Sequence, residues 1–413
     1  MKKIGCTVLI LFCLLVLSLS LSACHNSDEA ITLYVYNWGE YISDGSDGTL
    51  DVNAEFEKYC REALGLNVKV NYSTYSSNES MYAKISSGSA SYDIVIPSDY
   101  MIQRMVSEQL LAPLDLSKIP NYQYVDDSFK GENVYYEAND GKNYSVPYFY
   151  GMVGVIYNES IVAEDDEQIG SWELMWDTDY TGDILQFNNS RDAFGTALYY
   201  LGYDVNQATE EQWREALELL KAQKTVVQGY VMDEIFNKMK SGSAAVAAYY
   251  AGDFLSMYED NDSLAFFYPQ EGTNMYVDAM CIPANSRNQE LAHEYINFMC
   301  SERIAVANAE YTYYASPLKS VVENEDYRAT MSEVHEDAME ILYGETASSV
   351  PTQAYLNLSP ESLTRLNSLW EELKVESSIG KGIYIGCGLI VGALVLLGGT
   401  HILKKRRWAK LYD

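Results

Sequence analysis

Residues 34–41, Tyr-Val-Tyr-Asn-Trp-Gly-Glu-Tyr, place the carboxylate of Glu40 between the aromatic side chains of Trp38 and Tyr41. Apolar residues alternate with other types over 31–36, which predicts a strand that ends at this turn-prone segment. Ligands of open α/β sheets bind beyond the carboxyl ends of strands, and a carboxylate beside aromatic rings suits an organic ammonium ion. Taken alone, the segment is more simply interpreted as a surface loop with ordinary core aromatics.

The same kinds of side chain recur at the ends of other predicted strands. Two more carboxylates lie there among several aromatic residues. Each position has a structural explanation of its own, but the recurrence on both halves of the chain indicates one shared site. The candidates outside the first segment are Ser98, Tyr100, Asp192, Tyr249, Tyr250, Tyr276 and Asp278.

The elements that must hold these loops alternate between strands and helices. The first hundred residues read as strand-helix repeats, which predicts an α/β sheet with mostly parallel strands. Thr209 and Gln212 form a capping-box pattern that opens an amphipathic helix. An extended run over 145–151, followed by a strand at 152–157, is a candidate crossing between two domains. Other predicted strands are 67–75, 92–96, 183–187, 244–250, 264–268 and 277–282, and other predicted helices are 53–64, 80–87, 101–111, 171–176, 193–201, 291–300 and 363–373.

Composition narrows the class of protein. A chain of 413 residues, 48% of them hydrophobic, favours two domains with sizeable cores. The formal net charge of −31 argues against nucleic-acid binding and is compatible with a cationic ligand. Cys60, Cys281 and Cys300 lack metal spacing and are expected to be buried apolar residues, although one pair could form a disulfide. The sequence shows no zinc motif, so no metal and no cofactor are expected.

The N-terminus carries a targeting signal. Two lysines precede an apolar run over 4–21, so residues 1–23 are predicted to be a signal peptide. The cleavage region, Leu-Ser-Ala-Cys, resembles a bacterial lipobox. Cys24 is therefore expected to be lipidated, with 24–30 as a short polar tether to the membrane.

The C-terminus carries a second membrane signal. Residues 383–403 contain no Asp, Glu, Lys or Arg, and four basic residues follow at once. A helix of this length can cross a bilayer, so a transmembrane helix is predicted here. The positive-inside rule puts the basic tail, 404–413, in the cytoplasm. The ectodomain, about 31–376, is then expected on the extracytoplasmic face of the cell membrane.

Several segments, in order along the ectodomain, resemble the spermidine/putrescine-binding proteins of polyamine ABC transporters. The run Ser-Thr-Tyr-Ser-Ser-Asn-Glu-Ser-Met-Tyr-Ala-Lys, at 73–84, is the most specific of them. The C-terminal membrane helix is not part of the usual family pattern and is treated as an addition. The segments that carry the resemblance are 33–41, 72–84, 92–98, 144–148 and 278–285.

The resemblance implies an α/β fold of the type II periplasmic-binding class, with two lobes that close around a polyamine. Lobe 1 is expected to comprise residues 31–146 and 278–320. Lobe 2 is expected to comprise residues 147–277 and 321–376. The cleft between the lobes would then hold the ligand.

The resemblance also implies which residues contact the ligand. Three features depart from the family pattern: Gly39 stands where a threonine can occur, Asn189 stands where an acid can occur, and no equivalent of a C-terminal glutamine is evident near 355–357. Tyrosine also replaces tryptophan at two positions. The expected ligand contacts are Trp38, Glu40 and Tyr41 (N-W-x-E-Y), Ser98 and Tyr100 (P-S-x-Y), Asn189, Asp192, Tyr249, Tyr276 and Asp278.

The expected function is the substrate-binding component of a polyamine importer. It would capture spermidine or putrescine and deliver the ligand to ABC permease subunits with their ATPase. Two alternatives remain: the same fold serving another solute, and a polyamine sensor tethered by its membrane helix. An extracellular hydrolase with paired carboxylates is disfavoured, because the acids come with aromatics and no nucleophile elbow is found. No enzymatic activity is therefore expected.

Overall fold

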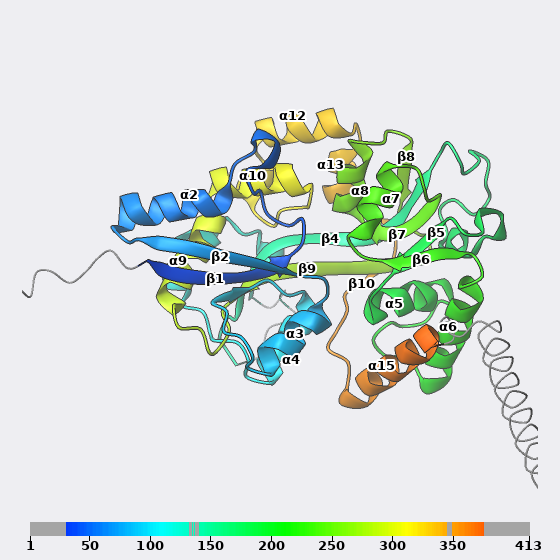
Figure 1. Cartoon of the computed structure of the whole chain (residues 1–413), viewed down its shortest axis with the longest axis horizontal. Helices are drawn as coiled ribbons and strands as arrows, with labels where there is room; N and C mark the ends of the chain where they lie inside the picture. The colour runs from blue at the N-terminus through cyan, green and yellow to red at the C-terminus, as the bar shows by residue number, and fades with distance from the viewer. Residues whose placement is uncertain (1–29, 132–133, 135, 137–139, 345–348, 376–413) are drawn as a thin grey trace, which may run out of the picture.

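The computed structural model describes residues 30–344 and 349–375, apart from 132–133, 135 and 137–139. Strands within these ranges form one ten-stranded sheet that runs along the middle of the molecule (Figure 1). They are β1 (Ile31–Trp38), β2 (Val68–Tyr75), β3 (Ile94–Val95), β4 (Ser145–Asn158), β5 (Ile184–Phe187), β6 (Val227–Val231), β7 (Val246–Tyr250), β8 (Leu264–Phe267), β9 (Thr273–Cys281) and β10 (Thr352–Gln353).

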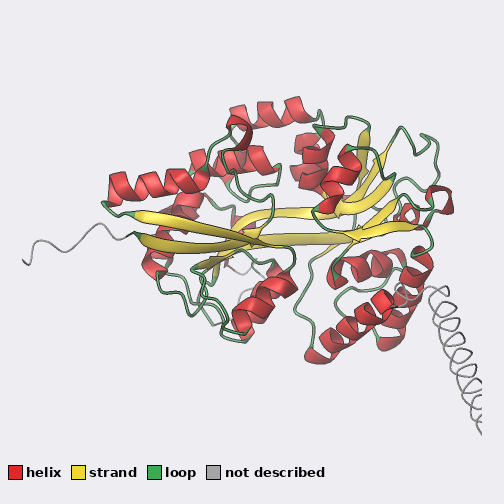
Figure 2. Cartoon of the chain, in the orientation of Figure 1, coloured by secondary structure: helices red, strands yellow, loops and turns green. Residues whose placement is uncertain are grey.

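Helices pack on both sides of this sheet (Figure 2). The predicted helix at 171–176 is instead a single 3₁₀ segment, Trp172–Trp176, because Asp177 ends it and caps the next short turn. The α-helices are α2 (Val52–Tyr59), α3 (Asn78–Ser86), α4 (Asp99–Ser107), α5 (Ser190–Tyr200), α6 (Glu210–Gln223), α7 (Glu234–Lys240), α8 (Ala251–Tyr258), α9 (Gln289–Met299), α10 (Glu302–Thr312), α11 (Lys319–Val322), α12 (Glu325–Val334), α13 (Ala338–Tyr343) and α15 (Pro360–Val375).

Two groups of parallel strands are joined by the long strands β4 and β9. β1 pairs in parallel with β2 and β3, and β5 pairs in parallel with β6 and β7. β4 and β9 pair antiparallel with each other, and they also connect to β7 and β3 respectively. The α/β architecture is therefore two-lobed, with each lobe built on one parallel group. The lobe borders expected after 146 and 277 fall inside β4 and β9 and stay a prediction.

Local sequence signals account for several element ends. The capping box that opens α6 is confirmed: the Thr209 backbone N–H donates to Gln212 Oε1 at 2.8 Å, and the Gln212 N–H donates to Thr209 Oγ1 at 3.3 Å. The segments predicted as 145–151 and 152–157 form one uninterrupted strand, β4, because the chain stays extended through both. β1 ends at Trp38, and Glu40 follows with a left-handed φ of 49°. The chain leaves strand β1 at this turn.

Three cysteines lie in the described part of the ectodomain. Cys60, Cys281 and Cys300 are buried and form no disulfide, so the expectation of buried apolar residues is confirmed and the alternative of a disulfide is not realised. Burial raises the pKa of the Cys60 thiol to about 11. These cysteines therefore act as small core residues rather than as reactive thiols.

Membrane attachment rests on parts of the chain that lie outside the described residues. These parts are the predicted signal peptide, 1–23, Cys24 with its tether as far as residue 29, and the predicted membrane helix with its basic tail, 383–413. Within the described ranges, no helix combines the length and apolar character needed to cross a membrane.

Candidate functional site

A cavity between the two lobes gathers all ten residues predicted as ligand contacts. It holds about 790 Å³ of space not filled by protein atoms, part of which is continuous with solvent. Trp38, Glu40 and Tyr41 enter from the end of β1, while Ser98 and Tyr100 enter from the start of α4. The other five come from the start of α5, the end of β7 and the middle of β9: Asn189, Asp192, Tyr249, Tyr276 and Asp278.

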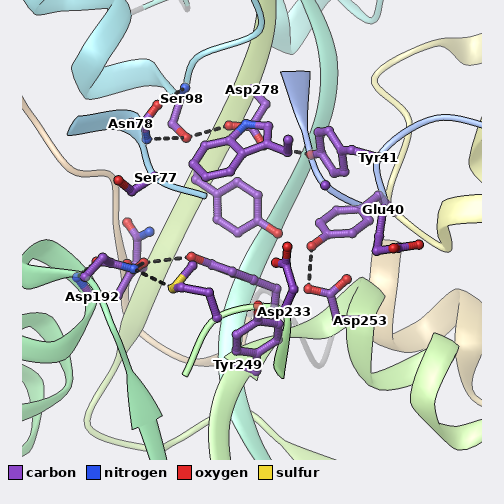
Figure 3. A pocket seen from close by; sticks show the side chains of 18 of the residues that line it. Glu40, Tyr41, Ser77, Asn78, Ser98, Asp192, Asp233, Tyr249, Asp253 and Asp278 are labelled. Atoms are coloured by element: carbon purple, nitrogen blue, oxygen red, sulfur yellow. Dashed lines mark hydrogen bonds between the residues drawn. The ribbon is translucent and has the colours of Figure 1, made fainter. Parts of the chain in front are cut away.

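Asp278 is held at one wall of the cavity by hydroxyl groups from the first lobe. The Tyr41 hydroxyl donates to Asp278 Oδ2 at 2.7 Å, and the Ser98 hydroxyl donates to Oδ1 at 2.5 Å. Asn78 fixes Ser98 in turn, because its amide donates to Ser98 Oγ at 3.0 Å and accepts from the Ser98 N–H at 3.1 Å (Figure 3). The carboxylate is therefore oriented before any ligand arrives.

Burial controls the charge of this carboxylate. Asp278 is 4% exposed, and desolvation raises its pKa to about 6, although the hydrogen bonds from Ser98 and Tyr41 favour the charged form. Within the described part of the chain, no ion pair compensates it. A cation placed against Asp278 would offset the cost of burying the charge.

Asp192 lies at another part of the cavity, in the first turn of α5. The Tyr250 hydroxyl donates to Asp192 Oδ2 at 2.7 Å, and the Asn189 amide donates to the same oxygen at 2.8 Å. Asn189 also caps α5 by accepting from the Asp192 N–H at 2.8 Å. An aspartate at 189 could cap the helix but could not donate to Asp192, so the amide lowers the negative charge here and holds the carboxylate still. Desolvation raises the pKa of Asp192.

A third group of carboxylates lies where the cavity meets an adjoining cleft. Glu40, Asp233 and Asp253 line both spaces. Asp253 is buried, and the Tyr314 hydroxyl donates to its Oδ2 at 2.8 Å (Figure 3). Desolvation is the main cause that raises the pKa of Asp253 to about 8, and the nearby charges of Asp233 and Glu40 add to it.

Aromatic rings form the rest of the wall. The Trp38 indole N–H donates to the Ile96 carbonyl at 3.0 Å, and its ring lies 4.7 Å from that of Tyr75. Tyr250 packs against Tyr276 with ring centroids 5.3 Å apart. These contacts fix the rings, so that their faces can cover methylene groups without a further loss of side-chain entropy.

Sequence reasoning missed several residues that line the cavity. Glu79 lies in the run at 73–84, whose motif indicated the family but no ligand contact. In the structure, the Tyr100 hydroxyl donates to Glu79 Oε1 at 2.9 Å. Asp253 follows the paired tyrosines within one turn of α8, which is a usable signal. Tyr355 had no signal, because its segment shows no periodicity. Tyr250, one of the paired tyrosines named as candidates from the sequence, also lines the cavity. The missed lining residues with polar side chains are Ser77, Asn78, Glu79, Asp99, Asp233, Asp253, Asn274, Tyr314 and Tyr355.

The charges of the cavity have one sign. Among the described residues that line it, seven carry carboxylates and none is lysine, arginine or histidine. No group of three or more potential metal ligands occurs within the described ranges. Carboxylates set among aromatic rings can bind an organic cation through charge pairing and cation–π contact.

Two lobes joined by long strands around such a cavity define a solute-binding protein of the periplasmic-binding fold. The family described as "Bacterial extracellular solute-binding protein" matches residues 53–332. The spermidine/putrescine-binding periplasmic protein of Salmonella typhimurium is 32% identical over 302 residues, which cover 73% of this chain and 81% of that protein.

Solved structures give the same result. A structure from Listeria monocytogenes, assigned to a spermidine/putrescine ABC transporter, has a TM-score of 0.73 and 34% identity over 83% of this chain and 98% of that one. The spermidine/putrescine ABC transporter substrate-binding protein of Streptococcus pneumoniae has a TM-score of 0.64 and 31% sequence identity. The match covers 84% of this chain and 99% of that chain.

The chain therefore belongs to the bacterial extracellular solute-binding proteins, in the family of the spermidine/putrescine-binding periplasmic proteins. Members of this family are solute-binding proteins of ABC transporters, and the chain is accordingly not an enzyme.

Proposed function

We propose that the cavity binds a polyamine, spermidine or putrescine, and that the protein is the substrate-binding component of a polyamine ABC importer. One observation carries the proposal: Asp192 and Asp278 are buried, face a common cavity and have no cationic side chain among the described residues that line it. The names of the relatives point to the same ligands.

The chemistry of a polyamine matches this arrangement. Each ammonium group needs a carboxylate, because burying an unpaired charge is prohibitively costly. Each methylene stem needs an apolar cover, which Trp38, Tyr249 and Tyr276 supply from the cavity wall. Micromolar affinity requires only about −8 kcal/mol, which a few charge-assisted contacts and aromatic burial can provide.

Ligand binding is proposed to favour the closed arrangement of the lobes. Trp38 is the last residue of β1 and Glu40 follows it, whereas Asp192 lies in the first turn of α5 in the other lobe, so one ligand would contact both lobes. A ligand that contacts both lobes only when they are closed shifts the population toward that state. ABC permease subunits, driven by their ATPase, would then recognise the closed form.

The ends of the chain are proposed to attach this receptor to the cell membrane. Lipidated Cys24 would anchor the N-terminus, and a helix at 383–403 would anchor the C-terminus. The ectodomain would then lie on the extracytoplasmic face, where solute is captured.

A thermal-shift assay on the full-length protein tests the ligand class. Spermidine and putrescine are expected to raise the unfolding temperature in a saturable way, because ligand binds the native state alone. Lysine, which carries a carboxylate, and a neutral sugar serve as controls and are expected to cause no shift. If neither polyamine changes the unfolding temperature, the proposal is wrong.

A further inference from the structure

The carboxylate of Asp233 reaches the cavity through space left by a missing side chain on the other lobe. A Cβ atom added to Gly39 would lie 2.8 Å from Asp233 Oδ2. Gly39 follows β1, whereas Asp233 precedes α7 in the second lobe. Any side chain at position 39 would therefore force the Asp233 carboxylate to move.

The Asp233 carboxylate has no partner in the described part of the chain, where it makes neither a hydrogen bond nor an ion pair. The residue is exposed at the mouth of the cavity, and partial burial of its carboxylate raises its pKa. Figure 3 shows Asp233 directed into the pocket near Asp253. A carboxylate that points into the pocket without a partner is suited to accept a cationic group.

Asp233 also marks the boundary between two spaces. It lines the cavity and the adjoining cleft, as do Glu40 and Asp253. Further acids line the cleft, and Lys240, the lysine among its described lining residues, pairs with Asp260 at 2.8 Å. The deeper carboxylates, Asp192 and Asp278, do not line the cleft.

We propose that Asp233, admitted by Gly39, holds an ammonium group at the mouth of the cavity and gives the receptor a preference for polyamines with three or more charges. The inference rests on the proposed function and refines it. A diamine places its two charges at Asp192 and Asp278 and leaves the mouth empty. A triamine extends its third charge to the mouth, where Asp233 completes the pairing.

The test compares spermidine with putrescine on variants of the full-length protein by calorimetric titration. Asp233→Asn is expected to weaken spermidine binding about tenfold and putrescine binding less than about threefold. Glu234→Gln is the matched control, because it removes one charge at the next residue, which lines the cleft but not the cavity. The control is expected to change either affinity by less than about twofold at physiological ionic strength.

Gly39→Ala tests the steric half of the inference, because its methyl group displaces the Asp233 carboxylate. Spermidine affinity is expected to fall about fivefold, and the double variant is expected to be no weaker than Asp233→Asn alone, since both changes remove one interaction. Additive losses, or equal losses for the two ligands, would overturn the inference while leaving the proposed function intact. If neither spermidine nor putrescine binds the unaltered protein, the proposed function itself is overturned.

Discussion

Tyr41 and Asp278 are 237 positions apart in the chain, yet the tyrosine hydroxyl donates a 2.7 Å hydrogen bond to the carboxylate. The bond links the turn after β1 to β9, one of the two strands that join the lobes. Tyr41 is fixed in turn, because its carbonyl accepts from the Tyr148 hydroxyl at 2.9 Å. The carboxylate that we expect to contact ligand is thus oriented by the framework of the fold.

Replacing Asp278 by asparagine should weaken polyamine binding at least about tenfold, since a paired ammonium loses its counter-charge. Thermal stability should stay nearly unchanged, because the charge of Asp278 is costly to bury in the ligand-free protein. Titration calorimetry and thermal unfolding measure the two effects.

Asp93→Asn is the matched control for this change. Asp93 is also buried, but it accepts hydrogen bonds from Ser286 and from the Asn288 backbone, away from the cavity. We expect it to lower stability and leave affinity unaltered. If the Asp278→Asn variant binds polyamines as tightly as the unaltered protein, Asp278 does not contact the ligand.

Trp38→Ala should cost about 1–3 kcal/mol of binding free energy without preventing folding, because the ring is only partly buried and faces the ligand space. Trp172→Ala provides the contrast. Trp172 is fully packed and its indole N–H donates to the Gly272 carbonyl at 2.8 Å, so its removal should destabilise the protein by about 3–5 kcal/mol. A normal binding curve for Trp38→Ala would contradict a stacking role for this ring.

Polyamine affinity should rise with pH between about pH 5.5 and 7.5. The pKa values of Asp278 and Asp253 in the ligand-free protein are raised to about 6 and about 8, so Asp278 loses its proton in the lower part of this range and Asp253 stays mostly protonated throughout it. A bound ammonium favours the charged forms, and binding therefore releases protons. Calorimetry in two buffers with different ionisation heats measures this release.

The same pKa shifts predict how the ligand-free protein responds to pH. The native state binds these protons more tightly than the unfolded chain, so stability falls as the pH rises through about 6 and about 8. Asp253→Asn should remove the higher-pH part of this loss. Affinity and stability that do not change with pH would contradict the assigned burial of these carboxyls.

Arg191→Ala should destabilise the protein by about 2–4 kcal/mol. The guanidinium lies 4.3 Å from the Tyr355 ring centroid and donates to the Val205 carbonyl at 3.1 Å, so its loss leaves a buried acceptor unpaired and frees the Tyr355 segment. Urea unfolding measures the loss. Arg214→Ala is the control, since that side chain is 58% exposed, and equal effects of the two changes would exclude a bracing role for Arg191.

Much of the fold follows from short-range patterns. The alternation near Val35 and the Thr209–Gln212 capping box predicted β1 and the start of α6, because strand period and helix capping depend on neighbouring residues alone. The continuity of β4 was not predicted. It depends on pairing with β9, whose residues lie more than a hundred positions later in the chain.

The site shows the same division. Glu40, Asp192 and Asp278 follow or lie within predicted strands and were found from that pattern. Tyr355 was missed, because its position depends on the pairing of β10 with β9 and on the contact with Arg191. Neither of these long-range contacts leaves a periodic signal in the residues around Tyr355.

Titration calorimetry of the full-length protein with spermidine and putrescine, with lysine as control, tests the central claim most directly. Saturable binding of a polyamine at micromolar or lower concentration, with no heat from lysine, is the expected result, because the cavity pairs ammonium groups and has no described cationic residue for a carboxylate. A flat titration with both polyamines would contradict a polyamine receptor and point to a different solute for the same fold.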